Sequence, residues 1–162
     1  MAQIDQSSEP EVLDLDRYVP ALLTFLSNKL SSGASACYRK HFGVGVVEWR
    51  VLALLAVENG ITANRICQVI GLDKSAVSRA LRLLEDAGHV KTEADPADAR
   101  RVIVHLTSQG RTLHNRILRV ARAREQRLLD DFTADEVDTL VDLLQRMNSR
   151  VQLVNSYDPS KS

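Results

Sequence analysis

The stretch DKSAVSRALRLLEDAG, residues 73–88, decides the fold and most of the functional interpretation. Its apolar residues recur at helical spacing and form one stripe: Ala76, Val77, Ala80, Leu81 and Leu84. The other side carries hydroxyls and cations: Lys74, Ser75, Ser78, Arg79 and Arg82. Asp73 is suited to cap the start of this helix, and Gly88 is suited to end it. An ordinary amphipathic surface helix is the alternative, although the polar face carries no acid before Glu85.

A second short helix is predicted immediately before this stretch. The segment TANRICQVI, residues 62–70, has its own apolar face, made of Ala63, Ile66, Cys67 and Ile70. Gly71 and Leu72 leave room only for a tight turn between the two segments. Two short helices joined by a glycine turn predict a helix-turn-helix, in which the second helix reads the major groove of DNA.

A hairpin with a basic tip is predicted downstream. Residues 90–92 and 102–106 are β-prone runs. Between them, EADPADARR, residues 93–101, contains proline and three acids, so we expect a turn or loop there rather than strand interior. Asp98 stands two residues from Arg100 and can hold its guanidinium in one direction, which suits a narrow minor groove. A solvated loop is the alternative; with the preceding helices, the hairpin predicts a winged helix-turn-helix.

Three segments carry a resemblance to a known family: EWRVLALL (48–55), the stretch 73–88, and D-x-R-R…LT-x-x-G (98–110). Together they resemble transcriptional regulators of the MarR family, over roughly residues 22–150. The resemblance implies a mainly α fold with a small β-hairpin wing, in which N- and C-terminal dimerisation helices flank the winged helix-turn-helix. It also implies a small-molecule site, often for an aromatic acid, between those helices and the DNA-binding module. Residues 38–53 further resemble members that govern the breakdown of plant phenolic acids.

The remaining segments predict how the chain is organised. We expect the following parts: a mobile N-terminal segment (1–13), an N-terminal dimerisation helix (14–42), the DNA-binding module (43–106), C-terminal dimerisation helices (107–154) and a mobile tail (155–162). Thr133 and Glu136 form a capping-box pattern at the start of the last helix. The apolar faces of the terminal helices exceed what the module can cover. A two-fold homodimer on a palindromic operator is the simplest solution.

Charge is distributed unevenly along a chain whose formal net charge is zero. Residues 61–124 hold 12 Lys and Arg against 6 Asp and Glu, and the rest of the chain holds 9 against 15. Binding to DNA phosphates needs a local basic patch rather than a basic protein. No apolar run approaches membrane-spanning length, and the first residues are acidic and polar, so we expect a cytoplasmic protein without a membrane partner.

Enzyme, metal and cofactor motifs are missing from the sequence. It contains no HExxH, CxxC, GxGxxG, P-loop or GxSxG pattern, so we expect neither catalysis nor a cofactor. Two alternatives to a ligand-responsive regulator stay open. Cys37, followed by the cations Arg39 and Lys40, could sense oxidants, whereas Cys67 is expected in the core. A helix-mediated protein-interaction module is the second alternative, and its binding would depend little on salt.

Two sets of site residues follow from this interpretation. For DNA, Lys74, Ser75, Ser78 and Arg79 would meet the major groove, Arg82 the backbone, and Arg100 the minor groove with Asp98 orienting it; Arg101 joins this set. For an aromatic acid, the candidates near the junction of the first two helices are Arg50, His41, Arg17, Tyr18 and Tyr38. Trp49 is expected in the core with Leu52 and Ala53. A salt bridge from Arg50 to Glu48 or Asp14 is the alternative to a ligand role. The expected function is a homodimeric repressor released by a small aromatic or phenolic acid.

Overall fold

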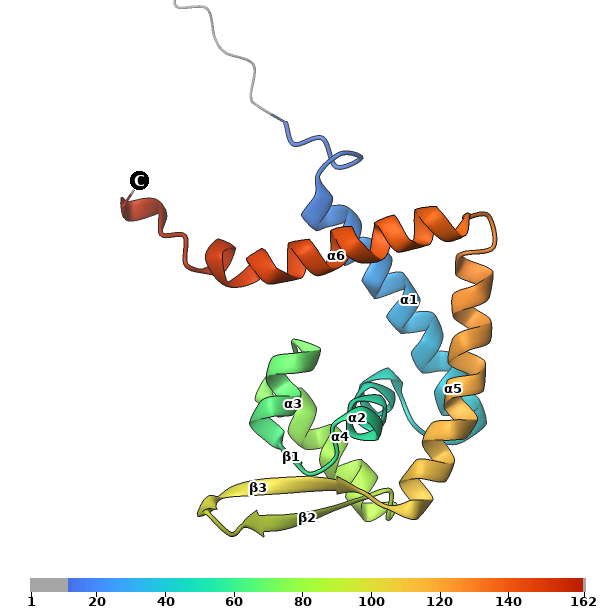
Figure 1. The fold of residues 1–162 in the computed structure, drawn as a ribbon, viewed down its shortest axis with the longest axis vertical. Helices are drawn as coiled ribbons and strands as arrows, with labels where there is room; N and C mark the ends of the chain where they lie inside the picture. The colour runs from blue at the N-terminus through green and yellow to red at the C-terminus, as the bar shows by residue number, and fades with distance from the viewer. Residues whose placement is uncertain (1–11, 162) are drawn as a thin grey trace, which may run out of the picture. The chain divides into compact units, whose positions relative to one another are not determined.

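The computed structural model describes the backbone of residues 12–161 and their side chains, except those of Ala99, Arg100 and Lys161. It is mainly helical with one small antiparallel sheet, as predicted (Figure 1). In chain order the elements are α1 (Val19–Phe42), α2 (Val46–Val57), β1 (Ile61–Thr62), α3 (Ala63–Ile70), α4 (Lys74–Asp86), β2 (Val90–Asp95), β3 (Asp98–Leu106), α5 (Ser108–Leu128), α6 (Ala134–Asn155) and the 3-10 turn η1 (Pro159–Lys161).

The helix-turn-helix forms where the sequence predicts it. The Thr62 hydroxyl accepts a hydrogen bond from the Arg65 amide and caps α3. Gly71 takes φ +67°, a conformation that L side chains rarely adopt, and this ends α3 in a tight turn. Asp73 Oδ1 then accepts from the Ala76 amide at 2.9 Å and caps α4. The predicted stripe of α4 is buried at Val77, Ala80, Leu81 and Leu84.

The core of the DNA-binding module is built around α2. Fully buried side chains from five elements meet there: Val51, Leu52, Leu55, Ile66, Val77, Leu84, Val104 and Ile117. Of the residues expected in the core of α2, Leu52 is fully buried, whereas Trp49 and Ala53 are only half-buried, so the predicted face was wrong. This helix is apolar on nearly every side, so its periodicity does not single out one face. Cys67 is also half-buried rather than in the core.

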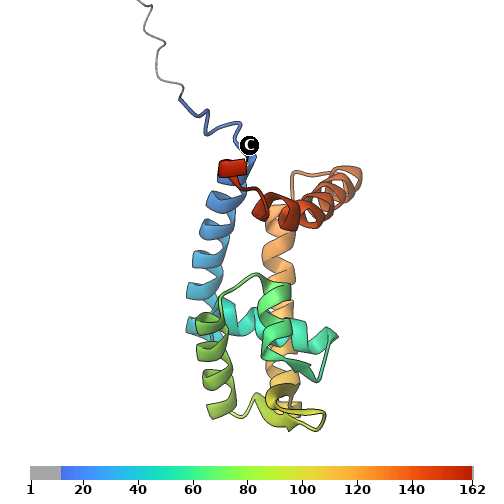
Figure 2. The same ribbon diagram turned by 90° about the vertical axis from the view of Figure 1, so that its left-hand side faces the viewer.

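The sheet has the strand order β1-β3-β2, with both pairs antiparallel. The prediction that residues 93–101 form a turn or loop was wrong, because pairing runs from Val90↔Leu106 to Asp95↔Asp98 and leaves a two-residue turn. Charged residues are tolerated in the outer part of these strands because Glu93, Ala94, Arg101 and Val102 are exposed. Figures 1 and 2 show the tip of the hairpin clear of α3 and α4. The short strand β1, which pairs with Ile103 and Val104, was not predicted.

The long helices also follow the predicted order. The helix α1 runs without interruption through Ser31–Gly33, although these residues favour helix poorly. The Thr107 hydroxyl accepts from the Gly110 amide at the start of α5. Thr133 and Glu136 form the predicted capping box on α6, and the hydrogen bonds from Thr133 hold the pKa of Glu136 below its usual value. Within residues 12–161, no helix is long and apolar enough to cross a membrane.

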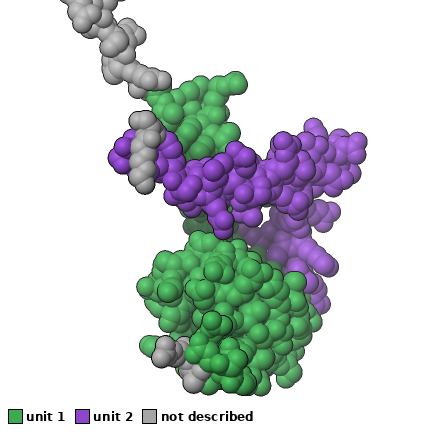
Figure 3. All heavy atoms as spheres, turned by 60° about the vertical axis from the view of Figure 1, so that its left-hand side comes forward, with its two compact units in different colours: residues 1–117 green, residues 118–162 purple. Residues whose placement is uncertain are grey.

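The chain divides into two compact units, residues 1–117 and 118–162, with the boundary inside α5 (Figure 3). The first unit holds the helix-turn-helix, the wing and α1; the second holds the rest of α5 and α6. Most of the predicted mobile segment 1–13 lies outside the described residues, as does Ser162 of the predicted tail. The mobility of both ends therefore stays a prediction.

Candidate nucleic-acid interface

One face of α4 is open and carries the predicted DNA contacts. Lys74, Ser75, Ser78, Arg79 and Arg82 are all exposed, whereas the opposite stripe packs into the core. Among the described side chains, Lys74, Arg79 and Arg82 form no salt bridge, so their charge is available to an external anion. The cap also matters here, because the hydrogen bond from Ala76 holds the pKa of Asp73 below its usual value and keeps it ionised at the start of the helix.

The wing carries a second group of cations. Arg101 Nε lies 3.3 Å from Asp98 Oδ2, and Asp95 Oδ1 accepts from the Ala97 amide across the turn. The side chain of Arg100 lies outside the described residues, so the pairing of Asp98 with Arg100 stays a prediction. Farther down the hairpin, the exposed carboxylate of Glu93 contacts His105 Nε2 at 2.8 Å and Lys91 at 3.8 Å.

A groove separates the wing from the two short helices. A cavity of about 440 Å³ lies in it, lined by Ala63, Asn64, Cys67, Lys74, Val77, Ser78, Leu81, Arg82, Glu85, Thr92 and Val102. A neighbouring, more polar cavity of about 560 Å³ is lined by Thr62, Ala63, Asn64, Lys74, Arg101 and Val102. Lys74 lines both cavities, and it shares one with Arg82 of α4 and the other with Arg101 of the wing. Thr62 and Asn64 were not predicted at this groove, because only the fold brings the start of α3 beside β3.

Close contacts tie the base of the wing to the start of α5. A Cβ on Gly110 would lie 2.0 Å from the His89 carbonyl oxygen, so only glycine allows this approach of α5 to the turn before β2. The Thr107 hydroxyl lies within 2.8 Å of the Gly88 carbonyl. Burial lowers the pKa of His89, whose Nδ1 is buried without a hydrogen-bond partner among the described residues.

A second candidate site lies where α1 meets α2. Arg50 Nη2 donates to the Ser31 hydroxyl at 2.8 Å, so the alternative of a salt bridge to Glu48 or Asp14 was wrong. Glu48 is buried and accepts from the Gly45 amide instead. The half-buried guanidinium of Arg50 therefore has a neutral partner in this structure, and it can still compensate the charge of a carboxylate.

Aromatic side chains surround this junction. Tyr38 is buried, and its ring meets that of Trp49 edge-on, with centroids 6.0 Å apart. Trp49 in turn stacks on His114, with centroids 5.4 Å apart and planes 18° apart. His41 is exposed and contacts Phe42. These rings form an apolar and aromatic environment of the kind that an aromatic ligand needs.

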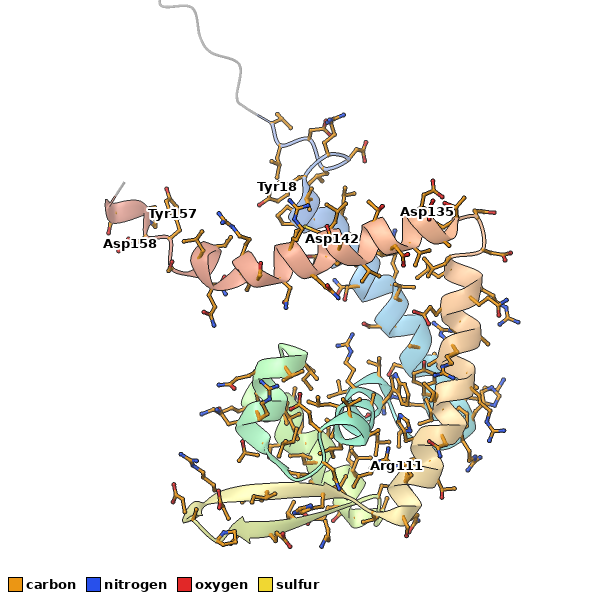
Figure 4. All side chains as sticks on the ribbon, viewed as in Figure 1. Tyr18, Arg111, Asp135, Asp142, Tyr157 and Asp158 are labelled. Carbon is orange, nitrogen blue, oxygen red and sulfur yellow. The ribbon has the colours of Figure 1, made fainter. Side chains whose placement is uncertain are left out.

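Arg17 and Tyr18 do not share this location. They precede the first turn of α1, whereas Tyr38 and His41 lie near its last turn. Figure 4 labels Tyr18 at that starting end. A helix of 24 residues is about 36 Å long, so the prediction that all these residues lie near one junction was wrong within a single chain.

The geometry gives little support to a redox or metal site among the described residues. Cys37 and Cys67 are both free thiols and both half-buried. Within the described part of the chain, no group of three or more His, Cys, Asp or Glu side chains is placed to hold a metal ion.

Comparisons with known proteins agree with this geometry. A sequence model of the MarR family matches residues 42–101. The crystal structure of a MarR/EmrR family transcriptional regulator from Acinetobacter sp. ADP1 is 32% identical, with a TM-score of 0.80 over 87% of this chain and 99% of that one. The PcaV transcriptional regulator from Streptomyces coelicolor, solved in complex with its natural ligand, is 25% identical, with a TM-score of 0.71 over 87% of this chain and 99% of that one. An HTH-type transcriptional repressor from Mycobacterium tuberculosis is 29% identical over 107 residues, which are 66% of this chain and 77% of the repressor.

Proposed function

Because the chain belongs to the MarR family of winged-helix transcriptional regulators, we propose that it is a homodimeric repressor that releases its operator when a small aromatic or phenolic acid binds. It is a DNA-binding regulator and not an enzyme.

The observation that carries the DNA-binding role is the open face of α4 beside the wing. Ser75, Ser78 and Arg79 would read base edges in the major groove, with Lys74 at the same face and Arg82 on the backbone. Arg100 and Arg101 would reach the adjacent minor groove from the wing. The groove between them is lined by cations on both sides, which suits a phosphate chain.

Exposed apolar faces in both units support dimerisation. In α1 the exposed large apolar residues include Leu22, Leu23, Phe25, Leu26 and Leu30. In α6 no residue is buried, and the exposed set includes Leu140, Val141, Leu143, Leu144, Met147 and Val151. Apolar surfaces of this extent are rare on soluble monomers and mark interfaces. A two-fold dimer would cover them and place two copies of α4 about one helical turn, roughly 34–36 Å, apart on DNA.

The junction of α1 and α2 supports a ligand that is both aromatic and acidic. Arg50 supplies a cation with a neutral partner, and Tyr38, Trp49 and His41 supply aromatic surface. Arg17 and Tyr18 stay candidates only if a second copy brings the start of its α1 to this junction. The relative from Streptomyces coelicolor was solved with a natural ligand, which is consistent with effector binding in this family. Ligand binding would favour a dimer whose α4 helices no longer match the two half-sites.

Selection of bound fragments from the organism's own DNA tests this function. A palindromic sequence should be enriched, and binding to it should weaken steeply with salt because phosphate contacts release counterions. When the enriched sequence is placed before a reporter gene, the protein should repress the reporter. At least one member of a panel of benzoates and hydroxycinnamates should relieve that repression. Binding to a protein partner with little salt dependence would favour an interaction module instead. Release by peroxide that Cys37→Ser abolishes would favour redox sensing.

A further inference from the structure

Glu85 is an acid on the side of α4 that faces the groove. It lines the same cavity as Ser78, Arg82 and Thr92. A carboxylate near the path of a phosphate chain opposes DNA binding through repulsion. The presence of Glu85 at this position therefore calls for a contribution other than DNA contact.

The hydrogen bonds of Glu85 show what it contributes. Its Oε1 accepts from the Thr92 amide at 3.1 Å and from the Thr92 hydroxyl at 2.5 Å. Glu85 lies in the last turn of α4, and Thr92 lies in β2, the first strand of the wing. One carboxylate oxygen thus joins the recognition helix to the wing by two charge-assisted hydrogen bonds, which are stronger than bonds between neutral groups.

The position of Thr92 in the sheet makes this contact effective. The strand β2 is at the edge of the sheet, and the outward amide of Thr92 has no neighbouring strand to bond. Thr92 pairs with Val104, and β1 pairs with β3 only at Val104 and Ile103. Glu85 therefore holds β2 inside the three-stranded part of the sheet, before the pairs from Ala94↔Val102 onward that β2 and β3 form without β1.

Other contacts at this corner fix the turn but not the direction of the hairpin. The amides of Gly88 and His89 bond to the carbonyls of Glu85 and Leu84, both at 2.8 Å. These bonds end before β2 begins at Val90. Beyond them, β3 is held by its pairing with β1 and by the buried Val104, whereas the edge strand β2 is hydrogen-bonded to an α4 side chain at Thr92, through Glu85.

We propose that Glu85 is a positioning residue that fixes the angle between the recognition helix and the wing, so that both reach DNA in one register. The proposal rests on the proposed function, in which α4 and the wing contact the same DNA. Glu85 then raises the preference for the operator over other DNA without touching a base. Nonspecific binding, which needs only phosphate contacts, does not require the fixed angle.

The test compares Glu85→Ala, Glu85→Gln and Asp86→Ala by titrating the full chain with operator and with random duplex at one salt concentration. Glu85→Ala should lower the ratio of the two affinities about tenfold, the order expected for charge-assisted hydrogen bonds. Glu85→Gln keeps an oxygen that accepts from Thr92 but loses the charge, so its ratio should lie between those of Glu85→Ala and the wild-type chain. Asp86→Ala removes an equal charge from the same exposed turn and should leave the ratio unchanged. An unchanged ratio in Glu85→Ala, or an equal loss in Asp86→Ala, would overturn the proposal.

A double-mutant cycle separates wing positioning from a general loss of fold. Glu85→Ala should add little to Arg100→Ala, because both act through the wing, and should add fully to Arg79→Ala, which acts through α4. The reverse pattern would overturn the proposal. If Glu85→Ala does not fold, Thr92→Val is a milder disruption of the same contact, because it keeps the amide and loses only the hydroxyl. It should also lower the ratio of operator affinity to random-duplex affinity. If the wild-type chain shows no preference for any duplex, the proposed function has failed rather than this inference.

Discussion

Asp98 and Arg101 form an ion pair at the tip of the wing, with Asp98 Oδ2 3.3 Å from Arg101 Nε. The sequence pattern pointed to Arg100 as the partner of Asp98, two residues away. In the structure the carboxylate contacts the cation three residues away, in the same strand β3. Arg100 and Arg101 are therefore the two candidates for the arginine that we propose Asp98 orients toward a minor groove.

The first prediction identifies the arginine that Asp98 orients. Asp98→Ala, Arg100→Ala and Arg101→Ala should each weaken operator binding. Asp98→Ala should be far from additive with the arginine it orients and close to additive with the other. Fluorescence anisotropy on the single and double variants gives both cycles. Additive losses in both cycles would mean that Asp98 does not act through either arginine.

The second prediction concerns Arg50 and the effector. Arg50→Ala should leave ligand-free affinity for the operator nearly intact and should blunt release by an aromatic acid, because the carboxylate loses its cation. Ser31→Ala is a matched control, since it removes only the neutral partner of Arg50. Release from the operator is followed while the acid is titrated. A normal inducer response in Arg50→Ala would move the carboxylate partner elsewhere, with Arg17 and His41 next.

The third prediction concerns assembly. Leu144→Glu, in the exposed apolar face of α6, should dissociate the dimer, because burying a carboxylate in an apolar interface is costly. Gln145→Glu adds the same charge one residue on, where the side chain is already polar and exposed, and should leave the dimer intact. Deletion of the residues after Phe132 should abolish dimerisation and operator binding together. A truncated chain that sediments as a dimer would place the interface elsewhere.

The fourth prediction follows from the lowered pKa of His89. Since burial favours its neutral form in the folded chain, the unfolded chain binds more protons between the folded pKa and about 6.5. The contribution of His89 to the free energy of unfolding is therefore complete above the unfolded pKa of about 6.5, and it is lost as pH falls through the folded pKa. His89→Gln should reduce the slope of stability against pH in this window, measured by urea unfolding from about pH 5 to pH 7.5. An unchanged slope would show that His89 titrates alike in both states.

Features that depend on neighbours in the chain could be predicted from the sequence. The caps at Asp73 and Thr133, the turn at Gly71 and the buried stripe of α4 each involve residues within four positions of one another. The extent of the wing could not be predicted this way. Strands 93–95 and 98–101 contain mostly charged residues and are held by cross-strand pairing, which leaves no pattern of burial in the sequence.

Site residues on a single helix could likewise be predicted from the sequence, whereas contacts between distant residues could not. Exposed polar residues on α4 were predicted because the opposite face had to be buried. The bonds from Glu85 to Thr92 and from Arg50 to Ser31 join residues 7 and 19 positions apart, and nothing in the local pattern selects either partner. Arg17 and Tyr18 were grouped with Tyr38 by residue type, and the length of a continuous α1 separates them.

The most direct measurement of the central claim is the base preference of Arg79→Ala in a competition assay against operators changed at single positions. If α4 reads the major groove, this variant should lose about 1–3 kcal/mol of binding free energy and relax the base choice at one position in each half-site. The exposed Leu83→Ala, which changes α4 without removing a polar group, should keep the wild-type preference. A base preference in Arg79→Ala identical to that of the wild-type chain would contradict sequence reading by this face of α4.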